Sequence, residues 1–284
     1  MKKIIFIALM TLAFTTGCKD GTTTPTDVSN TARTSTVTYV CVGMEKSKRF
    51  GECPGCKYDS ERMDKLFRDT FGYKGSLFQS EKATRDVVVR AIKDAVKATT
   101  EDSLFIFYYS GHGGQEYLGS PNTSEPSGAD EEDEYLCLYD TYLLDDEVWN
   151  MISKCKGRVF LIFDCCHSQT MFRSVATEVS IARGLGVPLE NKMVKSRGFN
   201  FKSRAIPLET DSLRMLCWSG CLEKEYSYGS SRGGVMTNSM LARWSKGMSY
   251  DNLWKYIETD VNKAQPTQHP KATQYGTGFK EAFK

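Results

Sequence analysis

The sequence has little excess charge of either sign and, beyond its first 18 residues, no long apolar run. Among its 284 residues, 37 Lys and Arg face 35 Asp and Glu, giving a formal net charge of +2. The basic residues are scattered, so nothing indicates a nucleic-acid partner. No later tract approaches the roughly 20 apolar residues that a membrane-spanning helix needs. The glycines of 229–234 also lack the pattern of a phosphate-binding loop.

The first 18 residues differ from the rest of the chain. Two lysines follow Met1, an apolar run extends from Ile4 to Phe14, and small residues lead to Cys18. This order is similar to a bacterial lipoprotein signal peptide, in which that cysteine is lipidated. An ordinary secretory signal, cut nearby, is the alternative. Export is expected in either case, and lipidation of Cys18 predicts a protein anchored to a membrane of the bacterial cell envelope. The Thr-rich residues 19–36 predict a flexible tether.

Ten cysteines need an explanation. Without Cys18 nine remain, an odd number, so at least one thiol stays unpaired if the others form disulfides. Cys53 and Cys56, in the segment CPGC, and Cys217 and Cys221 are close in sequence, but proximity does not establish pairing. The CPGC segment alone predicts a redox pair at the start of a helix, because a helix N-terminus lowers the pKa of a thiol.

Strand and helix patterns alternate after residue 36. This alternation predicts an α/β fold with one sheet of about six mostly parallel strands and helices on both faces. The segment 171–210 is basic and weakly periodic, which is typical of a functional or mobile loop. The expected strands include 37–44, 75–78, 103–109, 135–140, 159–163 and 213–219, and the expected helices are 59–71, 84–98, 145–155, 235–245 and 251–263.

Two of the expected buried strands end in residues that can carry chemistry. The strand 159–163 is followed by Asp164, Cys165, Cys166 and His167, and the strand 103–109 is followed by SGHGG with His112. Sites in open α/β sheets lie just beyond the carboxyl ends of such strands. A thiol is largely protonated near neutral pH, and a neighbouring histidine raises its thiolate fraction and can protonate a leaving amine. The pattern therefore predicts a cysteine and histidine site.

These motifs carry a family resemblance. FYYSGHGG at 107–114 and IFDCCHS at 162–168, about 50 residues apart, resemble the histidine and cysteine motifs of the caspase-like cysteine peptidases (clan CD, family C14), in particular the metacaspase branch. Residues 133–147, LRMLCWSGC and GGVMTNSML resemble further segments of that branch. The likeness implies a three-layer sandwich over 37–284, with a large-subunit-like part 37–170, a basic linker 171–210 and a small-subunit-like part 211–284.

The resemblance implies a cysteine endopeptidase that works through a thioacyl-enzyme and needs no cofactor for its chemistry. His112 would be the general base and acid, and Cys166 the nucleophile, because the family pattern selects the second of the two cysteines. The backbone N–H groups of Gly113 and Cys166 would form the oxyanion hole, which needs donors aimed at the developing charge.

The resemblance also implies substrates. Metacaspases cleave proteins or peptides after Arg or Lys, because an acidic pocket binds the basic side chain. Two carboxylates can pair with a guanidinium, and they would repel an acidic side chain. A tryptophan before a serine at a strand end is further expected to line the cleft. The residues that match the pocket are Cys56, Asp59, Ser110 and Asp164, and the cleft residues are Trp218 and Ser219.

Many enzymes of this branch bind calcium through aspartates. The resemblance assigns Asp145 and Asp146 to this site, with Asp130 or Asp133 as a third ligand, since oxygen ligands suit a hard cation. Acids at this place also suit the first turn of a helix, which is the simpler explanation. Arg173 lies where the family has a further aspartate.

Two other functions stay open. One is a catalytically silent caspase-like binding domain, although such members usually lose one of the two residues His112 and Cys166. The other is a thiol redox protein using Cys53 and Cys56, although the order of strands and helices around CPGC differs from the thioredoxin arrangement. The basic segment from Arg173 to Arg204 is expected to be a site of self-cleavage, because it is rich in Lys and Arg.

Overall fold

The computed structural model describes residues 36–117, 132–165, 181–182, 213–222, 225–280 and 283. For 115–117, 132–133 and 181–182 it describes the backbone only. All of these residues belong to one compact unit, Thr34–Lys284. The expected signal peptide, the tether, the lipidation site Cys18 and most of the basic linker lie outside the described residues.

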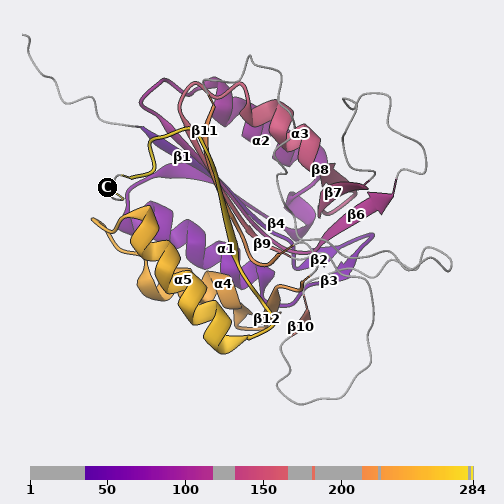
Figure 1. The fold of residues 1–284 in the computed structure, drawn as a ribbon. Helices are drawn as coiled ribbons and strands as arrows, with labels where there is room; N and C mark the ends of the chain where they lie inside the picture. Colours follow the sequence, from indigo (N-terminus) through magenta and orange to yellow (C-terminus); the bar gives the residue numbers. More distant parts are fainter. Residues whose placement is uncertain are drawn as a thin grey trace, which may run out of the picture. The chain divides into compact units, whose positions relative to one another are not determined.

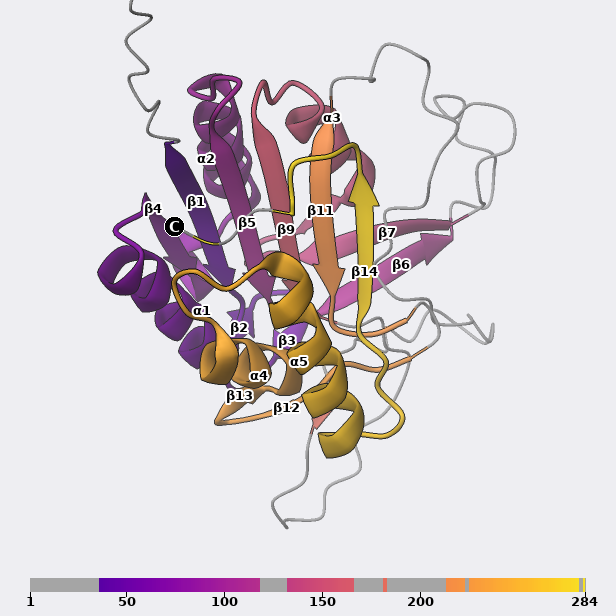
Figure 2. The same cartoon turned by 60° about the vertical axis from the view of Figure 1, so that its left-hand side comes forward.

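A six-stranded sheet forms the centre of this unit (Figures 1 and 2). Neighbouring strands run parallel except at one edge, where β14 pairs antiparallel with β11. The predicted α/β fold with a mostly parallel sheet is therefore confirmed. The order across the sheet is β14 (Lys271–Tyr275), β11 (Arg214–Ser219), β9 (Arg158–Asp164), β5 (Leu104–Ser110), β1 (Val37–Gly43) and β4 (Lys74–Gln79).

Helices cover both faces of the sheet, so the predicted three layers are present (Figure 2). The expected helix 59–71 begins three residues earlier, at Cys56, and its last part, Leu66–Thr70, is a π-helix. No described helix is long and apolar enough to cross a membrane. One face carries α1 (Cys56–Lys65), α4 (Val235–Arg243) and α5 (Tyr250–Ala264), and the other carries α2 (Arg85–Lys97) and α3 (Asp145–Ile152).

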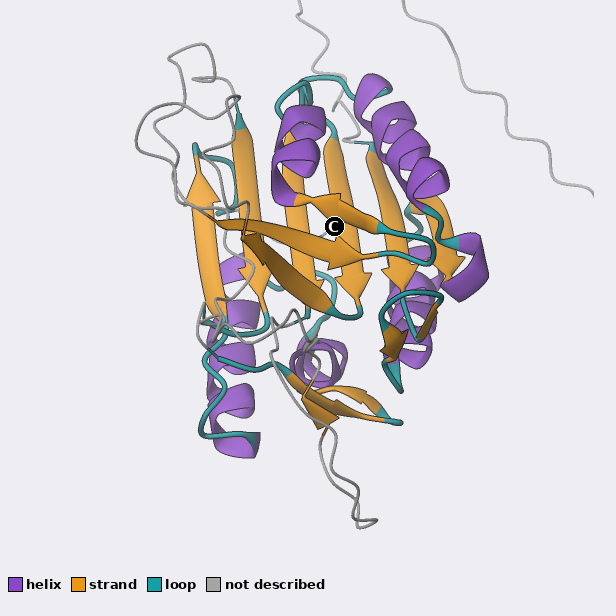
Figure 3. Cartoon of the chain, turned by 90° about the vertical axis from the view of Figure 1, so that its right-hand side faces the viewer, coloured by secondary structure: helices purple, strands orange, loops and turns teal. Residues whose placement is uncertain are grey.

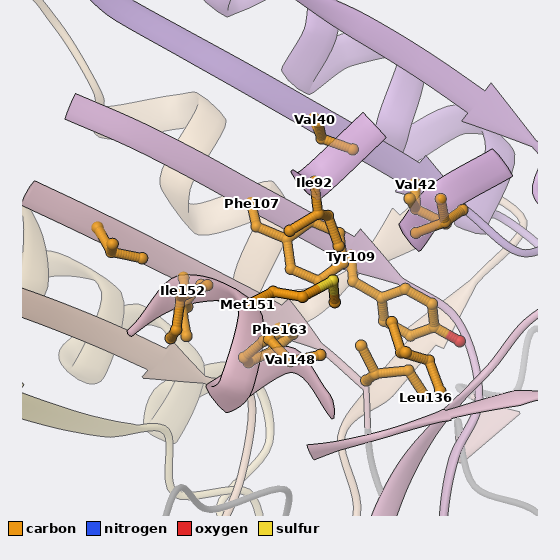
Figure 4. Packing of buried hydrophobic residues seen from close by; sticks show 14 of the residues in the cluster. Val40, Val42, Ile92, Phe107, Tyr109, Leu136, Val148, Met151, Ile152 and Phe163 are labelled. Carbon is orange, nitrogen blue, oxygen red and sulfur yellow. The ribbon is translucent and has the colours of Figure 1, made fainter. Parts of the chain in front are cut away.

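The core has two parts because successive residues of a strand point to opposite faces. On β5, Phe107 and Tyr109 join the cluster under α2 and α3, which is shown in Figure 4. Ile106 and Tyr108 join the cluster under α1, α4 and α5. This second cluster is rich in aromatic rings, and Trp218 lies within it. Burial on both faces explains why the central strands read as continuous apolar runs.

Small sheets were not predicted, although they shape the end of the main sheet (Figure 3). One begins three residues after β5 ends, so the chain turns from the central sheet directly into an antiparallel hairpin. The expected strand 135–140 falls in this hairpin and not in the central sheet, and the other two strands of the hairpin are too short to give a clear sequence signal. These elements are β6 (Gly113–Tyr117), β7 (Glu132–Cys137) and β8 (Tyr142–Leu144); β2 (Lys46–Ser47) and β3 (Gly51–Glu52); and β10 (Ile181–Ala182), β12 (Tyr228–Ser230) and β13 (Gly233–Gly234), besides a short 3₁₀ helix, Ser80–Lys82.

Candidate active site

The ends of three central strands lie side by side. Ser110, the last residue of β5, is the register partner of Asp164 on β9 and of Gly43 on β1. Because the strands are parallel, the residues that follow β5 and β9 leave the sheet at the same edge. Cys165 is the last described residue after β9, and the predicted nucleophile Cys166 lies outside the described residues. The register nevertheless brings together the two strand ends that the sequence singled out.

His112 lies between β5 and β6 and is 7% exposed. Its ring Nε2 is 3.0 Å from the carbonyl oxygen of Glu52, the last residue of β3. Since a carbonyl can only accept a hydrogen bond, this contact assigns the ring hydrogen to Nε2 and leaves Nδ1 as the basic nitrogen. This partner could not be predicted from the sequence, because a backbone acceptor does not depend on residue type.

The backbone of His112 is also held in place. The Tyr109 hydroxyl is 2.6 Å from the carbonyl oxygen of His112 and 2.7 Å from that of Cys137. The Cys137 N–H donates to the same His112 carbonyl at 3.0 Å. Burial raises the pKa of Tyr109 well above its ordinary value, so its hydroxyl stays protonated and remains a donor. The turn that presents the imidazole is therefore tied to both the central sheet and β7.

Asp59 on α1 is fully buried beside the end of β5. Its carboxylate accepts hydrogen bonds from the Ser110 hydroxyl at 2.9 Å and from the Gly234 N–H at 2.9 Å. The structure thus brings together Asp59 and Ser110, two of the residues expected in the acidic pocket. Cys56, the third, is fully buried at the first position of α1.

Asp164, the fourth residue expected in the pocket, is fully buried at the end of β9. Its carboxylate accepts hydrogen bonds from the Ser227 hydroxyl at 2.9 Å, the Thr237 N–H at 3.0 Å and the Thr237 hydroxyl at 2.6 Å. Thr237 lies in the first turn of α4, where the helix dipole favours a negative charge. The side chain of Gln268 donates to the Ser227 oxygen at 3.2 Å, so a second layer of bonds holds these donors.

Two glycines of β13 bring the carboxylates to one place. A Cβ on Gly233 would lie 2.0 Å from Oδ1 of Asp59, and a Cβ on Gly234 would lie 2.1 Å from Oδ2 of Asp164. Gly233 also has φ of 96°, which disfavours any side chain. Both aspartates therefore contact the same piece of main chain. The sequence suggested only a loop here, because the close approach depends on residues more than 60 positions away.

Arg62 is a residue of this region that sequence reasoning missed. Its Nη2 lies 2.9 Å from Oδ1 of Asp59 and 2.7 Å from Oδ1 of Asn238. Its guanidinium also lies over the ring of Tyr58, 4.1 Å from the centroid. The spacing of three residues from Asp59 on a helix is the signal that would have suggested the ion pair.

The structure corrects the expectation for Trp218. The indole is 1% exposed and packs against the rings of Phe160 and Trp254, at centroid distances of 4.7 and 5.3 Å. Alternation along β11 turns Trp218 toward the helices α4 and α5, so it belongs to the aromatic core and not to a cleft. Ser219, at the end of β11, is 4% exposed.

Burial raises the pKa of the nearby Cys217 thiol to about 12, so that thiol stays protonated at neutral pH.

The described residues do not assemble a calcium site. Within them no group of three or more His, Cys, Asp or Glu is placed to hold a metal ion. Asp145 and Asp146 open α3, the position where acids stabilise a helix. Asp130 lies outside the described residues, and only the backbone of Asp133 is described. Gly113, expected in the oxyanion hole, is the first residue of β6 and follows His112 directly.

Comparisons with known proteins agree with this architecture. A family model described as "Caspase domain" (Peptidase_C14) matches residues 40–278. Metacaspase-1 of Botryotinia fuckeliana is 33% identical over 281 residues, covering 82% of this chain and 65% of that protein. Metacaspase-1 of Pyricularia oryzae is 25% identical over 284 residues, covering 81% of this chain and 69% of that protein.

Solved structures show the same fold. The protein GSU0716 from Geobacter sulfurreducens superposes with a TM-score of 0.64 at 24% identity, covering 87% of this chain and 97% of that one. Caspase-1 from Spodoptera frugiperda superposes with a TM-score of 0.52 at 13% identity, covering 84% of this chain and 86% of that one. At these identities the likeness establishes the architecture alone. The region matched by the family model, residues 40–278, includes the end of β9 at Asp164 and the residue His112 that follows β5.

Proposed function

Because this chain belongs to the caspase domain family of cysteine-type peptidases, we propose that it hydrolyses peptide bonds after Arg or Lys through Cys166 and His112. Caspase-like cysteine peptidases are hydrolases whose chemistry needs no cofactor. One observation carries the basic specificity: Asp59 and Asp164, both fully buried, meet at Gly233 and Gly234 beside the strand ends that lead to the two catalytic residues.

The proposed reaction begins at the imidazole of His112. Its Nδ1 accepts the thiol proton of Cys166 while the Glu52 carbonyl holds Nε2–H at 3.0 Å. The thiolate attacks the carbonyl carbon of the substrate, and the N–H groups of Gly113 and Cys166 stabilise the oxyanion. The imidazolium then protonates the leaving amine. This step gives the thioacyl-enzyme, which water hydrolyses with His112 as the general base.

The substrate preference follows from the charge of the two aspartates. A buried carboxylate attracts a guanidinium or ammonium group strongly, because little solvent screens the interaction. The same carboxylates repel Asp or Glu at that position. Ser110, Ser227 and Thr237 hold the carboxylate oxygens in place, so the pocket is organised before the substrate arrives.

The proposal is tested with fluorogenic peptides that end in Arg, Lys or Asp, assayed on the full chain with and without calcium. We expect cleavage of the first two peptides only. Replacing Cys166 or His112 by Ala should lower kcat/KM by at least about 1,000-fold. The matched control is Cys165→Ala, which removes the adjacent thiol. Equal loss in Cys165→Ala and Cys166→Ala, or cleavage after Asp, would contradict the assignment.

The same assay separates the alternatives. A folded wild-type chain without hydrolysis would favour the silent binding domain, and activity that depends on Cys53 in place of Cys166 would favour the redox protein. Calcium stimulation stays a prediction, because the described residues supply only Asp145 and Asp146 of the expected ligands. Self-cleavage in the segment Arg173 to Arg204 predicts that a Cys166→Ala chain is not trimmed there.

We propose, finally, that the chain is exported and anchored to the cell envelope through lipidated Cys18. Support comes from the basic start, the apolar run and the small residues that precede this cysteine. Incorporation of labelled palmitate into the wild-type chain, and its absence in Cys18→Ser, is the expected result. Equal labelling of both chains would contradict the proposal.

A further inference from the structure

The segment Cys53-Pro54-Gly55-Cys56 forms a tight turn between β3 and α1. The Cys56 N–H donates to the Cys53 carbonyl at 3.3 Å, which closes a four-residue turn. Gly55 has φ of 88° and ψ of −8°, the values of the third residue in a type II turn, and Pro54 occupies the second position that proline favours. The turn type follows directly from the sequence, since only glycine adopts this conformation readily.

This turn is packed tightly against the site. A Cβ on Gly55 would lie 2.0 Å from the carbonyl oxygen of Ser230 and 2.9 Å from the N–H nitrogen of Gly233. The Gly55 carbonyl accepts the N–H of Asp59 at 2.9 Å. The turn is therefore fixed between β12, β13 and the first turn of α1. Its conformation is set by its neighbours as well as by its own residues.

The two sulfur atoms of the turn are in contact. The Cys56 thiol donates to the Cys53 sulfur at 2.9 Å, and the side chains are 0% and 2% exposed. A β-turn holds its first and fourth Cα atoms within about 7 Å, the range in which a disulfide can form. The sulfur atoms, 2.9 Å apart, are therefore separated by only about 0.9 Å more than the length of an S–S bond.

The two cysteines also lie between the strand residue that contacts His112 and the helix that carries Asp59. Cys53 directly follows Glu52, whose carbonyl oxygen contacts Nε2 of His112. Cys56 begins the helix that carries Asp59, one turn further along. A bond between the sulfurs would link the element that orients the imidazole to the element that carries the carboxylate.

We propose that Cys53 and Cys56 form a reversible disulfide that clamps this corner of the fold. The step is a thiol–disulfide exchange with a small disulfide such as oxidised glutathione. One thiolate of the pair attacks that disulfide, forming a mixed disulfide and releasing one glutathione thiolate. The second protein thiolate then displaces the other glutathione. The pair loses two electrons and two protons, and the glutathione disulfide takes them up. Because both sulfurs are buried, exchange proceeds during folding or on local opening of the turn.

The first test uses the full chain carrying Cys166→Ala, which removes the proposed nucleophile from the redox chemistry. The protein is refolded in glutathione buffers that range from reducing to oxidising, quenched with acid, alkylated and digested. In oxidising buffer we expect the peptide containing both cysteines to escape alkylation and to be lighter than the unmodified dithiol peptide by two hydrogen atoms. With excess reductant it should carry two alkyl groups. Alkylation of both thiols after oxidising refolding, or bridging to other cysteines, would overturn the proposal.

The second test measures the melting temperature of the same protein in both buffers. A four-residue loop predicts a modest gain, and we expect the oxidised form to melt about 2 to 6 °C higher. Cys53→Ala should abolish this difference, whereas Cys155→Ser, at a buried cysteine elsewhere in the core, should keep it. A difference that persists in Cys53→Ala would refute the clamp. Neither measurement depends on peptidase activity, so the outcome is independent of the proposed hydrolysis.

Discussion

The two carboxylates of the site have different surroundings, although both are fully buried and both face the same glycine pair. Asp59 lies on a helix and shares its charge with the guanidinium of Arg62 at 2.9 Å. Asp164 ends a strand, and its hydrogen bonds described above come from neutral groups, the hydroxyls of Ser227 and Thr237 and one N–H. An internal cation partly neutralises a carboxylate, so part of the charge of Asp59 is already offset by Arg62. We therefore expect Asp164 to contribute more than Asp59 to binding a basic side chain.

Among the substitutions that test this comparison, the largest effect is expected for Asp164→Asn. The substitution removes the charge and turns an amide toward the N–H and hydroxyl of Thr237, which need acceptors. We expect kcat/KM for an Arg-ended peptide to fall by about 100-fold, since breaking a buried charged contact costs roughly 2 to 5 kcal/mol. Asp59→Asn should lower it by about tenfold. Equal losses in the two variants, or melting temperatures that fall together with activity, would remove the distinction between the carboxylates.

Replacing Arg62 tests whether its positive charge limits the contribution of Asp59 to substrate binding. Arg62→Met removes the internal cation, so more of the charge of Asp59 is available for a substrate, and KM for Arg-ended peptides should fall a few-fold. The free energy of unfolding should also fall, by about 1 to 3 kcal/mol, because a buried carboxylate loses a charged hydrogen bond. Urea unfolding and steady-state kinetics measure the two effects. The matched control is Arg243→Met, whose partner Asp260 lies on the surface. A rise in KM would contradict the argument.

Thr237 offers a smaller and more local test. Thr237→Val keeps the backbone donor to Asp164 but removes the hydroxyl that contacts both Asp164 and Tyr108, at 2.6 and 2.8 Å. We expect the free energy of unfolding to fall by about 1 to 2 kcal/mol. Thr237→Ser retains the hydroxyl and is the matched control. If both variants unfold at the same urea concentration, the hydroxyl does not hold the carboxylate.

The smallest effect is expected at the exposed ion pair of Asp260 and Arg243, which serves as a reference for a carboxylate outside the site. Hydrogen bonding to Arg243 holds the pKa of Asp260 below its ordinary value. A lowered pKa in the folded state stabilises the protein above the unfolded value, near 3.9, and this contribution is lost as the pH falls through the folded pKa. Asp260→Asn should melt slightly lower than wild type at pH 7, and the gap should close below about pH 4. A gap that persists in acid would show another origin.

The fold could be predicted from the sequence because its signals are local. Strands buried on both faces read as unbroken apolar runs, and the helices show a regular spacing of apolar residues. These two patterns also placed the ends of β5 and β9 at one edge of the sheet, as their register confirms.

The partners within the site could not be predicted in the same way. Glu52 acts through its backbone carbonyl, and Gly233 and Gly234 act through the absence of a side chain. Arg62 and Asn238 meet across 176 positions of sequence, although the pairing of Arg62 with Asp59 had a local signal. Trp218 was misjudged because a strand end can point either way until the register is known.

The glycine pair limits how this pocket can be altered. Any side chain at position 233 or 234 would collide with a carboxylate oxygen. Only the main chain of glycine therefore fits between the two aspartates. Attempts to change the proposed substrate preference must therefore alter side chains other than these two positions. A combinatorial library that spares those two positions and varies Arg62 and Asn238 would keep the hydrogen-bond donors of Asp164 while changing the side chains beside Asp59.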